Sequence, residues 1–258
     1  MLLYATGDSF TYGAELAEYP GKRVCYDHKY REKHAYPARL AEHLGLEKAI
    51  NEGFGGGSNN YIIRKAMTFL SQWIADGKSP SEVFVVMGWS FPPRNEFFFP
   101  RQDTHNIKYL DVKDNEEGYI QHFSNMWVDP TWPNDVKKFV GVYTNRFMWG
   151  GEGNTRYAIY LLGMQSFLKQ HGFPYLFFNS CWSATPEVSE SGIIFSLIDQ
   201  TRCLGLYDKM EGMNCWCTYV KKTKQLPHGH PNEDGHDAWA KHLADHITSN
   251  NLLWLSSE

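Results

Sequence analysis

The chain has 258 residues, 42% hydrophobic and 16% aromatic, which is enough to bury a sizeable core. Its net charge of −4 argues against a protein that binds nucleic acid or an anionic membrane. No apolar run approaches the roughly 20 residues of a membrane span. The five cysteines form no disulfide-like pattern, and the first predicted strand begins at Leu2 with no signal peptide before it. We therefore expect a cytoplasmic protein, or one released on lysis, for example by a phage.

Strands and helices are predicted to alternate along the chain. In chain order, hydrophobic periodicity predicts a strand at 2–6, a helix at 36–44, a strand at 49–51, a helix at 61–74, a strand at 83–87, a helix at 156–170, a strand at 175–178 and a helix at 235–248. Such alternation is typical of a parallel sheet covered on both faces. The sequence therefore predicts an α/β fold, a three-layer α/β/α sandwich around a mostly parallel central sheet.

The stretch 91–150 interrupts this alternation. It is rich in Pro, Asp, Asn and aromatic residues, as in RNEFFFPRQDTHN and MWVDPTWPND. A loop region this long is usually functional or disordered, and the aromatic content favours an ordered segment that lines a site. Because there are no repeats, linkers or low-complexity tracts, we predict a single domain, 1–258, with a long loop-rich insertion at 91–150.

The segment GDSFTYG, residues 7–13, directly follows the first predicted strand. Ligands of parallel α/β sheets bind outside the carboxyl ends of the strands, where Ser9 would lie. A serine before a helix can also cap that helix, so Ser9 is either a nucleophile or a helix cap.

Three further segments are predicted to reach the same edge of the sheet. They are NEGFGGGSNN after the second strand, Gly88-Trp89-Ser90 after the third, and HGHPNEDGHDAWA before the last helix. The glycines either form turns or let an oxyanion approach the main chain. The last segment brings an imidazole to this edge.

In this order along the chain, the segments resemble the sequence blocks of the SGNH/GDSL hydrolase family. GDSFTYG resembles the block with the nucleophilic serine, GGGSNN the glycine block, and HPNEDGH the C-terminal histidine block. The resemblance implies the flavodoxin-like SGNH fold and a serine esterase or acyl hydrolase without a cofactor or a metal. It makes Ser9 the nucleophile, His230 the general base and Gly56 an oxyanion glycine.

The block that the family writes GxND differs in this chain. Gly88-Trp89-Ser90 stands in its place, so Ser90 replaces the oxyanion asparagine. The candidates for the missing donor are Ser90 itself, Asn59, Asn60 and Asn95. Loss of a good donor typically costs about 10²–10³ in rate.

The histidine block differs as well, because Pro227 stands three residues before His230, where the family has an aspartate. We expect a Ser9–His230 dyad whose imidazole is oriented by a backbone carbonyl or by a distant acid. A carboxylate from the insertion or from Glu211 would instead complete a triad. Asp8 is expected to support the turn rather than to orient the histidine.

Two other groups of residues have competing interpretations. Arg94 either reaches a substrate carboxylate or sugar hydroxyl, or it forms a salt bridge to Glu96 or a hydrogen bond within the loop. The second group is a cluster of histidines and aspartates near the C-terminus, which could bind zinc. No HExxH motif or cysteine cluster accompanies it, and the start of a helix with Asp234 near its N-terminus is the simpler explanation. This group consists of His228, His230, Asp234, His236 and Asp237.

The sequence thus predicts hydrolysis of a small acyl ester by Ser9 and His230. An O-acetylated carbohydrate is the first substrate to consider, because aromatic side chains often line sugar sites. The expected partner is a small-molecule or glycan ester, with no nucleic acid, no membrane and the oligomeric state left open. The alternative is a catalytically degraded member of the same fold that binds glycans or has a structural role.

Overall fold

The computed structural model describes residues 1–16, 28–92, 94–98, 119–122, 134–146, 152–180, 190–205, 219 and 230–254. A five-stranded sheet forms its centre, in the order β2-β1-β3-β6-β7, and every neighbouring pair of strands is parallel. These strands are β1 (Leu2–Gly7), β2 (Lys48–Asn51), β3 (Val83–Trp89), β6 (Tyr175–Asn179) and β7 (Cys203–Leu204). Counted along the chain, this is the 2-1-3-4-5 order of flavodoxin-like sheets, which confirms the predicted α/β fold.

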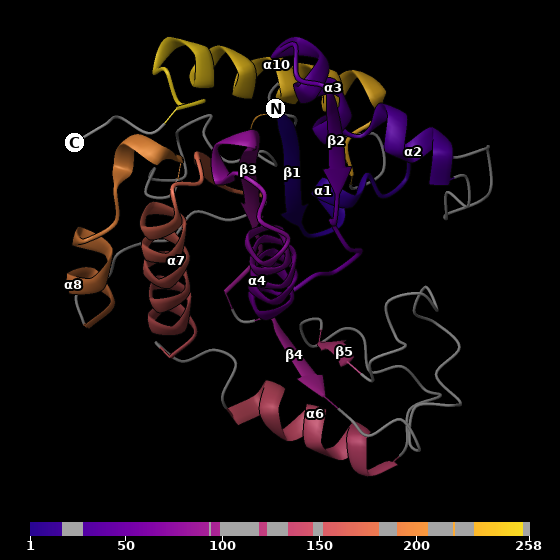
Figure 1. The fold of residues 1–258 in the computed structure, drawn as a ribbon. Helices are drawn as coiled ribbons and strands as arrows, with labels where there is room; N and C mark the ends of the chain where they lie inside the picture. The colour runs from indigo at the N-terminus through magenta and orange to yellow at the C-terminus, as the bar shows by residue number, and fades with distance from the viewer. Residues whose placement is uncertain are drawn as a thin grey trace.

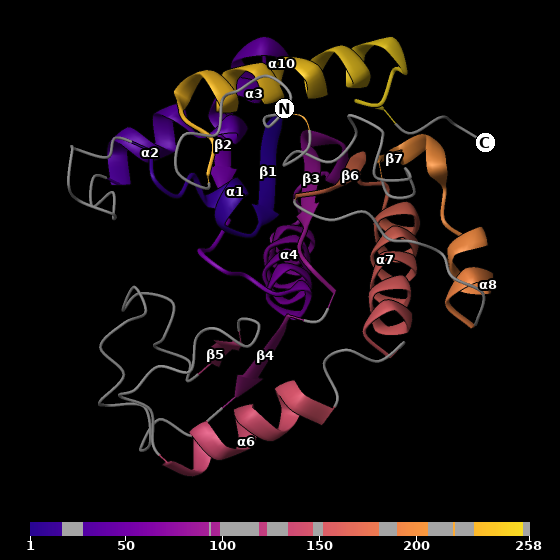
Figure 2. The same cartoon turned by 180° about the vertical axis from the view of Figure 1, so that it is seen from behind.

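Helices cover both faces of the sheet. Both views of the ribbon show α3 (Tyr36–His43) beside α10 (Glu233–Ser249), with α4 (Asn59–Ala75) and α7 (Glu152–His171) on the opposite side of the strands (Figures 1 and 2). Alternate strand residues point to opposite faces, so Tyr4 belongs to the core under α4 and α7. Its neighbours on β1 belong to the core under α3 and α10. The molecule therefore has the three predicted layers.

The remaining elements are short or lie outside the central sheet. They are α1 (Ser9–Tyr12), α2 (His28–His34), η1 (Pro80–Glu82), β4 (Asn95–Phe98), β5 (Tyr119–His122), α6 (Asn134–Arg146), α8 (Glu190–Ser196) and η3 (Gln200–Arg202). Within the described residues, no helix is long and apolar enough to cross a membrane.

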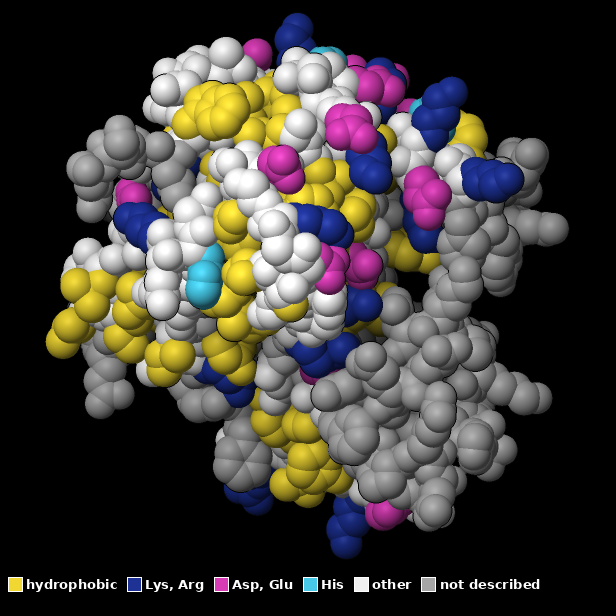
Figure 3. All heavy atoms as spheres, in the orientation of Figure 1, with side chains coloured by type: hydrophobic (Ala, Val, Ile, Leu, Met, Phe, Trp, Pro, Cys, Tyr) yellow, Lys and Arg dark blue, Asp and Glu magenta, His cyan; other side chains and the backbone are white. Residues whose placement is uncertain are grey.

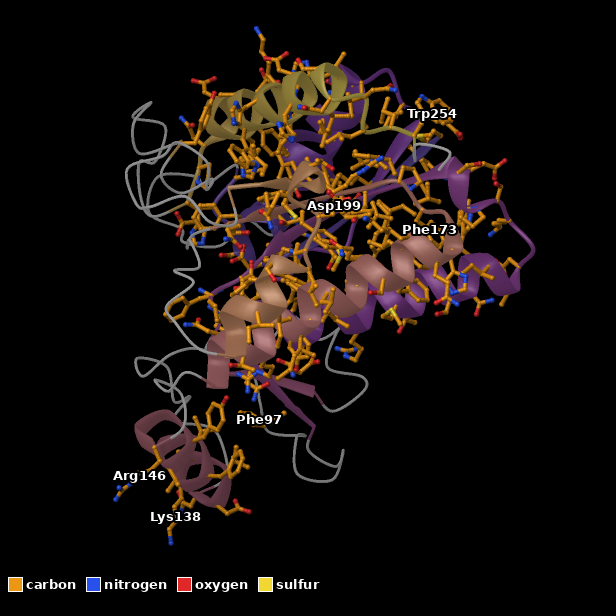
Figure 4. The ribbon with its side chains drawn as sticks, turned by 90° about the vertical axis from the view of Figure 1, so that its left-hand side faces the viewer. Phe97, Lys138, Arg146, Phe173, Asp199 and Trp254 are labelled. Carbon is orange, nitrogen blue, oxygen red and sulfur yellow. The ribbon has the colours of Figure 1, made fainter. Side chains whose placement is uncertain are left out.

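The described part of the 91–150 stretch contains regular structure that the sequence did not predict. β4 and β5 pair antiparallel, and α6 lies farther from the central sheet than β4 (Figure 1). Phe97 of β4 packs edge to face against Phe139 and Tyr143 of α6, with ring centroids 5.0 and 5.1 Å away. Figure 4 shows Phe97 facing α6, while Lys138 and Arg146 point away from the molecule. Aromatic contacts thus hold α6 to β4; the single-domain organisation stays a prediction.

Apolar side chains are also exposed on α8 and at Leu197, which directly follows it. Ile193 and Leu197 are 72% and 62% exposed, and Ile159 of the neighbouring α7 is 52% exposed. Figure 3 shows apolar side chains at the surface over this part of the molecule. The described core therefore uses only one face of α8, which includes the buried Phe195.

A buried arginine fixes the end of the chain to the sheet. Arg202, only 6% exposed, donates hydrogen bonds to the carbonyls of Leu252 and Trp254, which follow α10. Replacing Arg202 by methionine would leave these carbonyls without their donor. We expect the free energy of unfolding to fall by about 3 kcal/mol, measured by urea denaturation.

A matched substitution on the surface controls for the loss of an arginine. Arg39 pairs with Glu42 and Asp237, and its side chain is 31% exposed. Exposed ion pairs contribute little, so Arg39→Met is expected to cost less than about 1 kcal/mol. Equal losses in the two variants would show that the hydrogen bonds of Arg202 do not stabilise the C-terminal turn.

Candidate active site

The site begins where β1 runs directly into the short helix α1. Asp8 is the N-cap of this helix, because its Oδ1 accepts a hydrogen bond from the Phe10 amide at 3.1 Å. Ser9 is the first helical residue and is 8% exposed. Capping is therefore carried out by Asp8, and the hydroxyl of Ser9 is not needed for it.

Close backbone packing fixes the position of α1. Asn51 at the end of β2 donates from its amide to the Thr11 carbonyl at 2.8 Å and accepts from the Gly53 amide at 2.9 Å. A Cβ atom on Gly53 would lie 2.4 Å from the backbone nitrogen of Tyr12. Only glycine fits at this position, so the chain after β2 holds α1 against the edge of the sheet.

Ser9 and His230 are in direct contact although they lie 221 positions apart in the sequence. The His230 Nε2 atom is 2.8 Å from Ser9 Oγ, which is hydrogen-bond distance. The imidazole also packs against the Phe10 ring, with centroids 5.3 Å apart. This arrangement allows the imidazole to take the proton of the serine hydroxyl.

Glu15 faces the other side of the imidazole, and the sequence did not point to it. Its Oε1 lies 3.0 Å from His230 Nδ1, and its Oε2 accepts from the His230 backbone amide at 3.3 Å. The carboxylate lies off the line of the Nδ1–H bond; such contacts often align only when substrate binds. Ser9, His230 and Glu15 thus form the geometry of a serine–histidine–carboxylate triad.

The turn after α1 explains how Glu15 reaches the histidine. Gly13 ends the helix with φ 81°, and Glu15 itself has φ 68°, so the chain reverses over two left-handed residues. A non-glycine residue in this conformation costs about 1–2 kcal/mol. Such strain is often found at functional sites, and here it places the acid beside the imidazole.

Two backbone amides are candidates for the oxyanion donors, those of Ser9 and Gly56. Ser9 is at the start of α1, and Gly56 is buried with φ 78° in the turn between β2 and α4. Within the described residues, neither amide donates a hydrogen bond, whereas Gly57 donates to the Phe54 carbonyl at 2.9 Å. The role of Gly56 as an oxyanion glycine stays a prediction.

Ser90 and Asn59 belong to a polar network that includes Asp8, the residue before Ser9. The Asn59 side chain donates to the Ser90 carbonyl at 3.1 Å and accepts from the Ser90 amide at 2.9 Å, which holds the end of β3. The Ser90 hydroxyl donates to Asp8 Oδ2 at 3.1 Å and accepts from Arg94 Nη1 at 2.8 Å. Its one proton is therefore already used, so this geometry does not support Ser90 as an oxyanion donor.

Arg94 lies in the same network and does not pair with Glu96. Its Nη1 atom is 3.4 Å from Asp8 Oδ2, and the Asp8 side chain is completely buried. Glu96 instead pairs with Arg64, at 2.7 and 3.1 Å. The predicted alternative of an Arg94–Glu96 ion pair is thus wrong, because Arg64 on α4 occupies the Glu96 carboxylate.

The other two candidate asparagines bond to side chains on neighbouring helices. The amide of Asn60 donates to the Tyr160 hydroxyl at 3.0 Å, and the amide of Asn95 donates to the Tyr143 hydroxyl at 3.1 Å. The structure therefore does not bring Asn60 or Asn95 into the network with Asp8. Several other predictions concern residues outside the described ranges, namely Pro227, His228, Glu211, Cys25, Cys181, Cys215 and Cys217.

The histidine-rich segment attaches α10 to α3. His236 is completely buried, and its Nδ1 accepts from the Tyr36 amide at 3.1 Å. Burial, with a smaller effect of the neighbouring His230, lowers the pKa of His236 to about 3, so this imidazole is neutral. The N-cap of α10 is Asn232, and Asp234 lies in the first turn, where a negative charge stabilises the helix N-terminus. Within the described residues, no group of three or more His, Cys, Asp or Glu side chains is arranged to hold a metal.

Comparison with solved structures gives distant similarities. The acetylxylan esterase Axe2 from Geobacillus stearothermophilus is 13% identical, with a TM-score of 0.45, over 100% of this chain and 97% of that one. An alpha/beta hydrolase from the metagenome of Lake Arreo, Spain, is 14% identical, with a TM-score of 0.45, over 98% and 95%. A carbohydrate esterase described as having divergent catalytic and non-catalytic binding functions is 14% identical, with a TM-score of 0.43, over 98% and 70%.

No curated protein matches the sequence. One family model does, and its description is a family of unknown function, DUF6071. The match runs from residue 15 to residue 255 and so begins at Glu15, after the nucleophile candidate Ser9. Because this match spans nearly the whole sequence, the chain belongs to the DUF6071 family.

Proposed function

We propose that the protein is a serine esterase or acyl hydrolase that uses Ser9, His230 and Glu15. The observation that carries this proposal is the contact of His230 with both other residues, at 2.8 Å to Ser9 Oγ and 3.0 Å to Glu15 Oε1. A nucleophile hydrogen-bonded to a base, which is itself oriented by an acid, is the arrangement that activates a serine hydroxyl.

The reaction follows from the three side chains. Ser9 Oγ attacks the carbonyl carbon of an ester while His230 Nε2 takes the hydroxyl proton, and Glu15 stabilises the imidazolium that forms. The imidazolium then protonates the leaving alcohol, which leaves Ser9 acylated. Water attacks this acyl-enzyme with His230 again as base, and the carboxylic acid departs as Ser9 regains its proton.

The negative charge of the tetrahedral intermediate needs hydrogen-bond donors. The backbone amides of Ser9 and Gly56 are the proposed pair, because neither donates a hydrogen bond within the described residues. The proposed substrate is a small acyl ester, and an O-acetylated carbohydrate is the first to test. Support for the carbohydrate comes from the aromatic content of 16%, since aromatic rings often line sugar sites.

Covalent labelling with a fluorophosphonate tests the proposal. The wild type should gain one label on the peptide that contains Ser9, and it should release p-nitrophenol from p-nitrophenyl acetate. Ser9→Ala should do neither. Ser166→Ala is the matched control, because Ser166 bonds to the Leu162 carbonyl on the exposed side of α7, and it should label like the wild type.

The same samples distinguish the alternative. A folded wild type that neither labels nor hydrolyses any ester, but binds on a glycan array, would replace the esterase by a binding module of the same fold. A label on a serine other than Ser9 would keep the hydrolase and reject this site.

A further inference from the structure

A charged group is buried directly beside the proposed nucleophile. The Asp8 side chain is completely buried, and it precedes Ser9 in the chain. A second anion, the oxyanion, forms next to it during the reaction, and two negative charges this close repel each other. The Arg94 guanidinium lies 3.4 Å from Asp8, so a positive charge lies next to this buried carboxylate.

Some N–H groups of Arg94 are not used by the described network. Its Nη1 atom donates to Ser90 Oγ at 2.8 Å and contacts Asp8, while Nε and Nη2 have no partner among the described residues. The side chain is 21% exposed, so these donors are not sealed inside the core. A guanidinium presents five N–H groups in a fixed plane, which allows one edge to hold the network while another binds a ligand.

The other side chains of this network keep at most one N–H group without a partner among the described residues. The Ser90 hydroxyl donates its single proton to Asp8. The Asn59 side chain is held against the Ser90 backbone by two hydrogen bonds. Arg94 is therefore the side chain of this network with two nitrogens, Nε and Nη2, that have no partner among the described residues, and it contacts the residue that precedes Ser9.

We propose that Arg94 is a catalytic residue that donates a hydrogen bond to the oxyanion of the tetrahedral intermediate, with Asp8 and Ser90 holding its guanidinium in place. This rests on the proposed esterase activity. The guanidinium then replaces the side-chain amide that Ser90 lacks, and its charge offsets the repulsion between Asp8 and the oxyanion. Because Asp8 balances Arg94 in the resting site, the network favours neutral esters over esters with a carboxylate.

Arg94→Lys is the decisive variant. Lysine keeps a positive charge beside Asp8, so the fold is expected to survive. It has one terminal nitrogen and lacks the further N–H groups that the guanidinium would offer to the oxyanion. We expect kcat to fall by about 10²-fold while KM changes little, since the lost interaction exists only in the transition state. Arg94→Met should lose at least as much, and thermal melting of both variants reports whether they are folded.

Two comparisons separate this role from others. p-Nitrophenyl butyrate and the mono-p-nitrophenyl ester of succinate differ by a carboxylate, and the loss of kcat should be the same for both. Arg64→Met is the matched control, because Arg64 pairs with Glu96, two residues from Arg94 in the chain, at 2.7 Å. It should keep the kcat of the wild type.

Each of the other outcomes overturns the inference. If Arg94→Lys kept the kcat of the wild type, Arg94 would be only the counterion of Asp8. A loss confined to KM of the succinate ester would make it a receptor for substrate carboxylates. An equal fall in Arg64→Met would mean that a loosened segment, not a lost donor, lowers the rate. A wild type that hydrolyses neither ester would instead overturn the proposed function, and this inference with it.

Discussion

Replacing Glu15 by glutamine is expected to lower kcat about 10⁴-fold at neutral pH, with little change in KM. The glutamine side chain has nearly the same shape, but its amide would donate to His230 Nδ1. The ring would then carry its proton on Nε2, the atom 2.8 Å from Ser9 Oγ, and could no longer accept the serine proton. Steady-state hydrolysis of p-nitrophenyl acetate measures the effect.

A second carboxylate at this edge of the sheet provides the control. Glu52 pairs with Lys65 at 3.1 Å and, among the described residues, with no imidazole, so Glu52→Gln should keep the rate of the wild type. If Glu15→Gln stays within about threefold of the wild type, the machinery is a Ser9–His230 dyad, as the sequence suggested. Glu15 would then serve only to hold the turn.

The largest loss of stability is expected from Gly53→Ala. The added methyl group would lie 2.4 Å from the Tyr12 nitrogen and 2.7 Å from the Thr11 carbonyl carbon, both of them backbone atoms. A backbone cannot rotate away as a side chain can, so α1 would have to move. We expect a loss of about 3 kcal/mol or more in urea denaturation. Because Ser9 begins α1, fluorophosphonate labelling should slow in the fraction that still folds.

Gly55→Ala controls for the change of glycine to alanine. It lies in the same turn, but a Cβ atom there meets nothing within 4 Å. Alanine should leave stability unchanged or raise it slightly, because it restricts the unfolded chain. If both variants melted like the wild type, close packing of the chain after β2 would not be what fixes α1.

The central sheet could be predicted because each of its main strands carries a strong local signal. VFVVM at β3 and YLFF at β6 are continuous apolar runs, as expected for strands buried on both faces. The helices α4 and α10 show apolar residues at helical spacing, and their observed ends differ from the predicted ones by less than about one helical turn. β7 was missed, since two residues are too few for a periodic pattern.

The candidate site could be predicted only in part. Ser9 and His230 stand in recognisable segments, whereas Glu15 stands in none, and its position depends on a left-handed backbone that sequence patterns do not show for glutamate. Arg94 was considered, but its partner depends on which of two arginines lies next to Glu96, and that is decided by the tertiary packing of α4. Side-chain pairing of this kind follows from the fold and not from local sequence.

The arrangement of the proposed triad along the chain has a consequence for its assembly. Ser9 and Glu15 lie on one tight turn, so they take up their positions together when this turn folds. His230 lies just before α10, 221 positions from Ser9 in the sequence. The site is therefore complete only when the chain around His230 packs against the turn that holds Ser9 and Glu15. Local opening of the chain around His230, at the start of α10, would separate His230 from Ser9 while the parallel sheet stays folded. Turnover would then report on the docking of the chain at the start of α10, and activity should disappear on heating before the core of the sheet melts.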